Sequence, residues 1–134
     1  TQLATYIFIL HQSCCTHHGG LVKAGQHHPL SDKDVQRLGR TYHAICNLFR
    51  DTPITDERSY LEDVPNIRGY IARIRTAIAH HIDDQDIRFY TPQDTSDKSR
   101  YYIAIDPTKI TLRLSSGEIP FMDYPLWKTL ASKH

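Results

Sequence analysis

The fold of this chain is decided by residues 65–82, which read PNIRGYIARIRTAIAHHI. Large apolar side chains recur there at intervals of three and four residues, as they do on one face of an α-helix. On a helical wheel of about 100° per residue they fall within an arc about 100° wide, and they are Ile67, Tyr70, Ile71, Ile74 and Ile78. We therefore expect a core-facing helix over residues 66–82 and interpret the rest of the chain around it.

Small side chains occupy a second face of this helix, on which the residues are Gly69, Ala72, Thr76 and Ala79. Because such side chains leave the helix backbone accessible, another helix can approach this face closely. Arg75 lies at one border of the small face and His80 at the other. The competing interpretation is that the alanines simply favour helix formation on a solvent-exposed face.

The same stretch is locally basic. From Pro65 to Ile82 the chain has three arginines, two histidines and no acidic residue, although its net charge is only +1. A phosphate backbone is the partner that fits such a patch best. Alternatively, Arg68 and Arg73 are solvated or paired with acidic residues elsewhere in the chain.

The hexapeptide Arg75-Thr76-Ala77-Ile78-Ala79-His80 resembles the motif of the HEPN family, in which four residues separate an arginine from a histidine near the end of a long helix. The wording Ala-Ile-Ala-His is typical of that family. The chain departs from it at Thr76, where the family usually has Asn, Asp or His, but threonine keeps a hydrogen-bonding group. We therefore expect a mainly α fold, a HEPN-like helical bundle of about four to five helices with a small C-terminal β-hairpin.

The resemblance also implies a dimer in which two such helices pair and form one composite ribonuclease site without metal or other cofactor. Cleavage through a 2′-hydroxyl needs a base, an acid and a cation. Two copies of His80 can supply the base and the acid, and Arg75 can bind phosphate. Five residues on a helix turn a side chain by about 140°, so these two catalytic groups meet more readily across a two-fold axis than within one chain. The residues expected to contact substrate around them are Thr76, His81, Arg68 and Arg73.

Two positions after the motif carry separate expectations. His81 falls beside the core stripe, so we expect it to be buried or half-buried rather than to act as a second catalytic base. Some HEPN proteins that pair with nucleotidyltransferases carry a tyrosine two positions after the motif histidine, as the target of nucleotide transfer. Ile82 stands there in this chain, and regulation by modification of that residue is not expected.

These observations predict a metal-independent endoribonuclease of the toxin or phage-defence type, with RNA as substrate and an antitoxin or activator protein as a further partner. Two alternatives stay open: a non-catalytic HEPN-like dimer that binds RNA, a nucleotide or a partner protein, and a metal-binding regulator. The regulator would use a His/Cys-rich segment whose spacing matches no standard zinc motif, so no metal ligand is assigned. The members of that segment are His11, Cys14, Cys15, His17, His18, His27 and His28.

Chain length, cysteine content and the longest apolar stretch limit the class of protein this can be. At 134 residues the chain fits a single domain with one core. Its three cysteines, two of them adjacent, cannot build a disulfide framework, which favours a reducing, cytoplasmic location. The longest apolar stretch, residues 3–10, is about half of the ~20 residues that span a bilayer, so no membrane association is expected.

Two helices are expected in the first part of the chain. Residues 3–14 carry apolar side chains at helical spacing, although residues 5–9 are β-branched and aromatic enough to form a strand. Residues 16–31 contain four histidines and no apolar period, and they are interpreted as a long loop. Ser31, followed by two aspartates, predicts the start of the most regular helix, which should end near residues 51–53.

The chain between this helix and the motif helix is expected to hold one short helix. Thr55 can cap it, and Pro65 either ends it or opens the next helix. All of residues 1–82 would then form the helical core of one domain that covers residues 1–134. Residues 83–100 hold five aspartates and are interpreted as a mobile acidic loop.

The period of the apolar residues changes to two beyond residue 100. Residues 101–105 and 109–114 alternate around Asp106-Pro107-Thr108, which predicts a β-hairpin with a proline-containing turn. A further turn at Ser115-Ser116-Gly117, a third strand near residues 118–121 and a short helix over residues 125–133 would complete the 101–134 part. The hairpin aromatics Tyr101 and Tyr102 either pack or form a stacking edge for single-stranded RNA.

Overall fold

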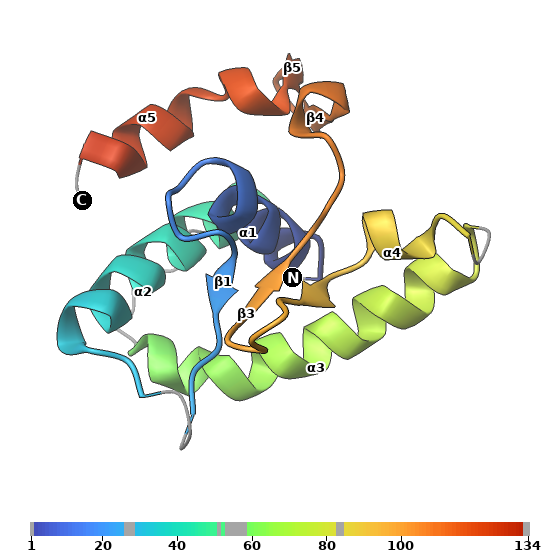
Figure 1. Cartoon of the computed structure of the whole chain (residues 1–134). Coiled ribbons are helices and arrows are strands. Elements are labelled where there is room, and N and C mark those ends of the chain that lie inside the picture. The colour runs from blue at the N-terminus through green and yellow to red at the C-terminus, as the bar shows by residue number, and fades with distance from the viewer. Residues whose placement is uncertain (1, 26–28, 51, 53–58, 83–84, 133–134) are drawn as a thin grey trace.

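A computed structural model describes residues 2–25, 29–50, 52, 59–82 and 85–132 of the chain. Its helices are α1 (Gln2–Cys14), α2 (Asp32–Asn47), α3 (Tyr60–Ala79), α4 (Ile87–Tyr90) and α5 (Pro125–Ser132) (Figure 1). Its strands are β1 (Leu21–Val22), β2 (Gln93–Asp94), β3 (Arg100–Tyr102), β4 (Thr111–Leu114) and β5 (Gly117–Pro120), and two 3-10 turns are η1 (Pro107–Lys109) and η2 (Phe121–Asp123). The mainly helical class with a small C-terminal hairpin is confirmed.

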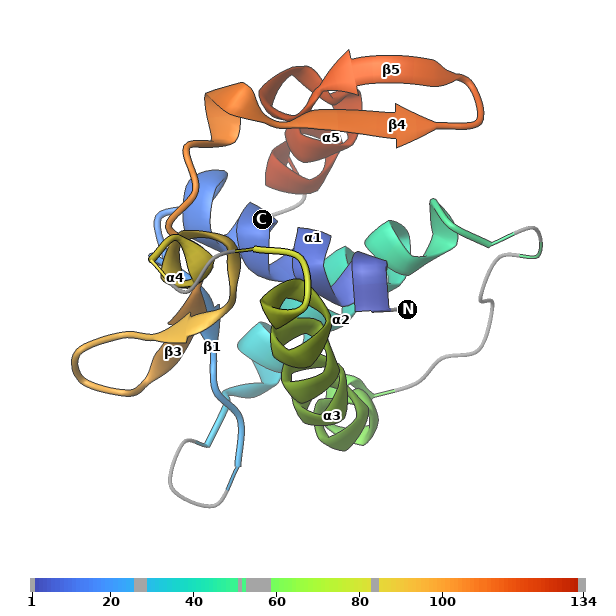
Figure 2. The ribbon, with the colours of Figure 1, turned by 90° about the vertical axis from the view of Figure 1, so that its right-hand side faces the viewer.

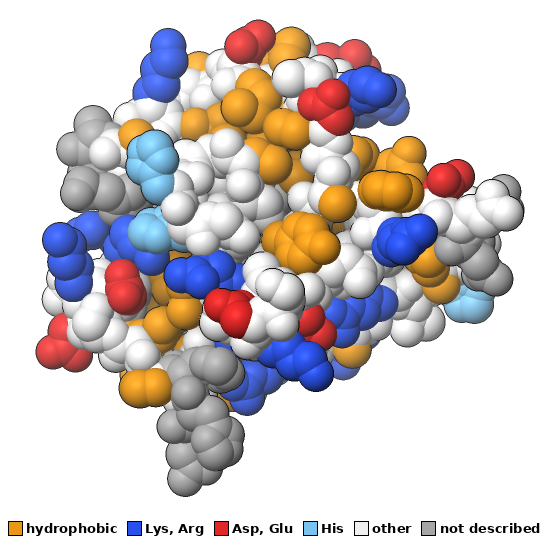
Figure 3. All heavy atoms as spheres, in the orientation of Figure 1, with side chains coloured by type: hydrophobic (Ala, Val, Ile, Leu, Met, Phe, Trp, Pro, Cys, Tyr) orange, Lys and Arg blue, Asp and Glu red, His pale blue; other side chains and the backbone are white. Residues whose placement is uncertain are grey.

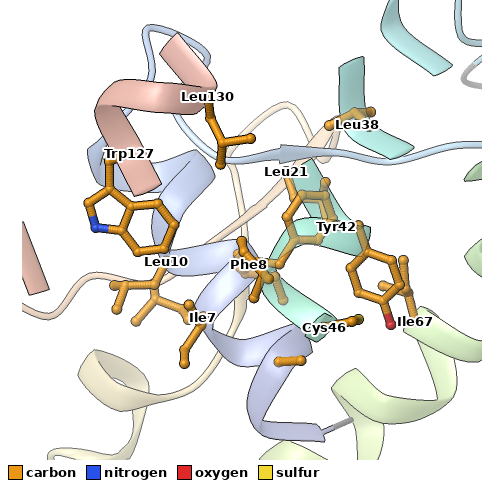
Figure 4. Close-up of a cluster of buried hydrophobic side chains, with 14 of the residues drawn as sticks. Ile7, Phe8, Leu10, Leu21, Leu38, Tyr42, Cys46, Ile67, Trp127 and Leu130 are labelled. Carbon is orange, nitrogen blue, oxygen red and sulfur yellow. The ribbon is translucent and has the colours of Figure 1, made fainter. Parts of the chain in front are cut away.

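Helix α1 is the central element, and it packs against α2, α3 and β3. Its side chains are buried on nearly every face, which is the pattern of a helix inside a core rather than at a surface. Figure 4 shows Phe8 of α1 among Leu21, Leu38 and Tyr42, and the Phe8 and Tyr42 rings lie 5.1 Å apart. The expected helix is therefore confirmed, and the strand alternative for residues 5–9 is wrong because burial on all sides outweighs local β propensity.

Helix α2 begins where the capping signal indicated. The Ser31 hydroxyl accepts a hydrogen bond from the backbone N–H of Asp34 at 3.2 Å, and two aspartates occupy the positive end of the helix dipole. The helix ends at Asn47, a little before the expected residues 51–53, of which Asp51 and Pro53 lie outside the described residues.

Helix α3 is one helix of 20 residues instead of a short helix followed by a longer one. Its N-cap is Ser59, whose hydroxyl accepts from the Leu61 N–H at 3.3 Å, and the helix continues through Pro65. A proline removes one intrahelical bond, and burial of Tyr60 and Ile67 on either side of it holds the helix together. The helix ends at Ala79, three residues before the expected end, and the proposed cap at Thr55 lies outside the described residues.

Three short strands form a sheet that the sequence interpretation missed. The antiparallel order is β1-β3-β2, with Leu21 opposite Tyr101 and Gln93 opposite Tyr102. The expected loop over residues 16–31 therefore contains β1. The expected loop over residues 83–100 contains α4 and β2. Strands of two or three residues have no readable alternation, and β1 pairs with a segment far along the chain.

The C-terminal hairpin is formed by different strands from those expected. Residues 109–114 contribute β4, which pairs with β5 and not with residues 101–105. Asp106 accepts from the Thr108 N–H at 3.0 Å and starts the 3-10 turn η1, so this proline-containing segment is a connection rather than a hairpin turn. The turn at residues 115–116 and the final helix α5 are confirmed.

The C-terminal elements cover one side of α1. Figure 2 shows β4, β5 and α5 together on the side of α1 opposite α3. Trp127 of α5 stacks on His11 at 4.7 Å between ring centroids, and its indole N–H donates to the Phe121 carbonyl at 2.6 Å. Among the described helices none is long and apolar enough to cross a membrane.

Candidate functional site

Arg75 is half-buried on α3 and points toward the sheet. Its Nε–H donates to the carbonyl of Pro92, just before β2, at 2.9 Å. Arg68, seven residues earlier and therefore on the same side of the helix, donates through Nη2 to the carbonyl of Ala24 after β1. Two arginines of the motif helix thus fasten the segments that flank the sheet to α3.

The Nη atoms of the Arg75 guanidinium are available for binding. Within the described residues its terminal N–H groups have no hydrogen-bond partner. Its charge acts on Asp94 of β2, whose pKa is lowered mainly by its hydrogen bond to Lys23 and also by Arg75. Arg75 is therefore held in place through Nε, while four N–H groups can bind an anion.

His80 is the C-cap residue of α3 and its side chain is exposed. Its backbone N–H donates to the Ile78 carbonyl, so the helix end does not depend on the imidazole. About 140° of helix rotation separates it from Arg75, and Arg75 faces the sheet. The two catalytic candidates diverge within one chain, as expected.

His81 is exposed, and the expectation that it would be buried or half-buried is wrong. The helical wheel placed it beside the core stripe only if the helix reached residue 82. The regular helix ends at Ala79, and the N–H groups of His81 and Ile82 both donate to the Ile78 carbonyl in a final turn that leaves His81 exposed. Its side chain is accessible to a substrate that approaches His80.

The small-residue face of α3, formed by Gly69, Ala72, Thr76 and Ala79, is exposed along its whole length. A side chain placed on Gly69 would meet no atom within 4 Å, so packing within the chain does not require glycine there. A shallow depression of about 400 Å³ lies at this face, lined by Gln2, Ala72, Arg73, Thr76 and Ala77. The Thr76 hydroxyl donates to the Ala72 carbonyl at 3.1 Å, which leaves its oxygen as an acceptor.

Arg73 lines this depression, and its side chain is exposed. Its guanidinium carbon is 5.9 Å from the centroid of the Tyr70 ring, a weak cation–π contact. Unlike Arg68 and Arg75, it bonds to no backbone carbonyl among the described residues. Of the three arginines, Arg73 is the one that is free to contact a ligand with its whole guanidinium.

A histidine and aspartate pair between α2 and α3 was not anticipated. The His43 Nε2 lies 2.9 Å from Oδ2 of Asp63, and both side chains are largely buried. The sequence shows only that His43 precedes Cys46 by three residues, and nothing local links it to Asp63. Burial raises the pKa of the Cys46 thiol, as expected of an inert buried cysteine.

The His/Cys-rich segment is divided between core and surface. His11 is buried beneath Trp127, whereas His17 and His18 are exposed. Burial raises the pKa of the Cys15 thiol to about 11, so this cysteine is protonated at neutral pH. Across the described residues no group of three or more His, Cys, Asp and Glu side chains could hold a metal ion, and His27 and His28 lie outside those residues.

Loss of either carbonyl-bound arginine should destabilise the fold. We expect Arg75→Ala and Arg68→Ala each to lower the free energy of unfolding by about 1–2 kcal/mol, because each leaves a carbonyl without its charged donor. Arg73→Ala, on the same helix, is the matched control and should change it by less than about 0.5 kcal/mol. Urea unfolding followed by circular dichroism measures all three. Equal effects for all three would contradict the structural role of Arg68 and Arg75.

The two tyrosines of β3 support packing rather than an open stacking edge. Both are half-buried, and the Lys23 ammonium covers the Tyr101 ring at 4.8 Å from its centroid. The candidate site is therefore the exposed face of α3 with Arg73, Arg75 and His80 at its borders. No protein-family model, curated protein or solved structure matches the chain in the comparisons.

Proposed function

We propose that this chain is a metal-independent endoribonuclease of the HEPN type that acts at a composite site between two copies of α3. The observation that carries the proposal is the exposed small-residue face of α3, with Arg75 at one border and His80 at the other. A symmetric pairing through that face would bring the two Arg75 and the two His80 side chains toward a common axis. RNA cleavage in a toxin or phage-defence system in the cytoplasm, controlled by an antitoxin or activator protein, is the setting we propose.

The chemistry needs only the groups that such a pair would contain. One neutral His80 imidazole would take the proton of the 2′-hydroxyl, and the 2′-oxygen would form a bond to phosphorus. As the bond from phosphorus to the 5′-oxygen breaks, the protonated imidazole of the other His80 would give that oxygen its proton. The products would be a 2′,3′-cyclic phosphate and a 5′-hydroxyl end.

The terminal N–H groups of Arg75 would stabilise the negative charge that develops on the phosphoryl oxygens. The hydrogen bond from its Nε to Pro92 supports this role, because a guanidinium already held by the backbone loses little freedom when it binds phosphate. Arg73 and the exposed His81 would contact neighbouring parts of the RNA. Arg68 is committed to Ala24 and would contribute charge rather than a direct contact.

A second candidate function is a non-catalytic dimer that binds RNA, a nucleotide or a partner protein through the same face. The observation that favours it is again the Arg75 bond to Pro92, because that bond gives this arginine a structural reason to be present. The two candidates differ in one measurable property, which is whether RNA is cleaved.

Cleavage by the wild-type protein should persist in excess chelator, because the proposed mechanism needs no metal-activated water. A mixed RNA pool incubated with the full chain and EDTA should be cut, and the new ends should carry cyclic phosphate. Activity that is lost on chelation and restored by zinc would favour the metal-binding regulator. An RNA pool left intact by a protein that dimerises through α3 would favour the binding function.

A further inference from the structure

A groove of about 270 Å³ runs between β4 and α1. Apolar side chains line one wall, among them Leu3, Ile7 and Leu10 of α1 and Phe49 after α2. The other wall consists of five consecutive residues, 110–114. Successive side chains of a strand point to opposite faces of its sheet, so a groove lined by five residues in a row follows the edge of the strand. Figure 2 shows β4 between β5 and α1, and this edge of β4 therefore faces α1.

The register of the hairpin leaves backbone groups free on this edge. The Phe121 N–H donates to the Ile110 carbonyl at 2.9 Å, and hydrogen-bonded and non-hydrogen-bonded pairs alternate from there along the antiparallel ladder. Thr111 and Arg113 therefore occupy the non-hydrogen-bonded positions of β4. Their N–H and C=O groups point away from β5, and no backbone hydrogen bond reaches them within the described residues. Each of these two residues offers one donor and one acceptor to a further strand.

The outer edge of β5 does not offer the same pairing. Pro120 stands opposite Thr111, so it also occupies a non-hydrogen-bonded position, and the N–H that proline lacks is one that would face outward. A proline at such a position is a common protection of an edge strand against the addition of another. Of the two edges of this hairpin, that of β4 combines free donors and acceptors with an apolar groove.

Arg113 is the one charged residue among the described residues that line the groove. Its side chain is 85% exposed, and its Nε lies 3.0 Å from a carboxylate oxygen of Glu118 on β5. Within the described residues its Nη groups have no hydrogen-bond partner. A strand added on the free edge would place a side chain beside Arg113 on the outer face of the sheet. An acidic side chain suits that position, because it can accept from the Nη groups.

The apolar surface continues beyond the groove. Tyr6 also lines it, and the Tyr6 hydroxyl donates to the carbonyl of Tyr90 on α4 at 2.8 Å. Leu3 is 57% exposed and Phe89, next to Tyr90, is 47% exposed. Figure 3 shows apolar side chains gathered where α4 approaches the C-terminal elements. Contiguous apolar surface on a folded protein is typical of an interaction site.

We propose that an extended segment of a partner protein adds to the free edge of β4 as a third strand of the β4-β5 sheet. Thr111 and Arg113 exchange main-chain hydrogen bonds with this segment, and its alternate, apolar side chains enter the groove against α1. The side chains between them lie on the outer face, with an acidic one beside Arg113. This inference does not depend on the proposed ribonuclease function, because β4 lies on the side of α1 opposite α3.

The probe is a blocked peptide of about eight residues in which valine alternates with threonine and glutamate, and NMR follows amide hydrogen exchange of the full chain with and without it. The N–H groups of Thr111 and Arg113 should exchange about tenfold or more slowly at saturating peptide, because they gain partners. N-methylation of one alternate set of peptide amides should abolish binding, and N-methylation of the other set should not. Only one set faces β4, so this difference identifies an added strand.

Two variants with matched controls locate the peptide. Thr111→Pro removes a free N–H and no β4-β5 hydrogen bond, and Ile110 before it already has the extended backbone that a following proline requires. It should weaken peptide binding by about tenfold or more, whereas Thr111→Val, which keeps the N–H, should not. Leu3→Glu places a charge at the groove and should weaken binding similarly. Leu61→Glu, at a leucine of α3 that is 52% exposed, should leave binding unchanged.

Three results would overturn the proposal. The first is a peptide that does not bind the wild type. The second is a peptide that binds but leaves the Thr111 and Arg113 amides unprotected, or binds Leu3→Glu as tightly as the wild type. The third is protection of these amides that rises with the concentration of the chain alone, which would make a second copy the occupant of the edge.

Discussion

Replacing His80 with alanine should lower the rate of RNA cleavage by about 10²- to 10⁴-fold, the usual effect of removing a general acid or base, while RNA binding persists. The structure indicates that this variant will not disturb the fold. The imidazole is exposed, and the helix end is closed by the backbone N–H of residue 80 and not by its side chain. The loss should therefore be chemical, with no change in thermal stability.

The assay compares cleavage of a mixed RNA pool, RNA binding and thermal melting for wild type and variant. His17→Ala is the control, because it removes another exposed imidazole from a different element, the turn after α1. It should leave cleavage unchanged. Cleavage that survives in the His80 variant would remove the catalytic role of this residue, whereas a parallel loss of binding would make it a substrate contact.

Arg75 is a less direct probe of the same site. Arg75→Ala should impair cleavage and RNA binding together, but it also removes the donor to Pro92 and should lower stability. His81→Ala, in contrast, should not affect stability now that its side chain is found to be exposed. The effect of each variant on melting thus separates the structural and the chemical contributions of the motif.

The helices could be predicted because their signals are local. The hydroxyl of Ser31 and the two aspartates after it fix the start of α2 within one turn of chain. The apolar stripe of α3 is buried at Ile67, Ile71 and Ile74, as the spacing indicated. Neither feature needs information from elsewhere in the molecule.

The sheet could not be predicted because its evidence is not local. Leu21 and Val22 become a strand only because Tyr101 and Arg100 lie opposite them, and two residues carry no alternation to read. The same reason explains the incorrect hairpin: residues 101–105 have the period of a strand, but only Tyr101 and Tyr102 form one, and their partners in β1 and β2 come earlier in the chain. Pro65 shows the opposite case, in which a local signal gave a wrong prediction. Proline usually breaks a helix, but α3 continues through Pro65 with Tyr60 and Ile67 buried on either side of it.

The sequence predicts the angle between the Arg75 and His80 side chains around the helix, but not the hydrogen-bond partners of the arginines. Helical geometry alone separates Arg75 from His80, and the structure agrees with that separation. The partners of Arg68 and Arg75 are carbonyls of Ala24 and Pro92, in segments that the sequence interpretation treated as loops. Residues chosen for charge therefore proved to have structural roles, which only tertiary placement reveals.

The pairing of α3 is the assumption on which the composite site rests, and Ala72→Glu tests it most severely. A symmetric interface would bury this carboxylate twice, once from each protomer, at a cost of several kcal/mol per unpaired charge. Since about 1.4 kcal/mol corresponds to a factor of ten in affinity, dimerisation should weaken more than 100-fold and cleavage should disappear with it. Each chain should still fold, because Ala72 is exposed in the single chain.

Sedimentation at tens of micromolar measures the assembly directly. The wild type should be a dimer, Ala72→Glu a monomer, and Ala79→Glu, two positions further along the small-residue face, a monomer as well. Ala131→Glu places the same charge on an exposed alanine of α5 and should remain a dimer with full activity. A wild-type monomer that cleaves RNA would refute the composite site, because the Arg75 and His80 side chains of one chain diverge and a single imidazole would have to serve as both base and acid. A dimer that survives Ala72→Glu and Ala79→Glu would move the interface away from α3, and with it the place where the two histidines could meet.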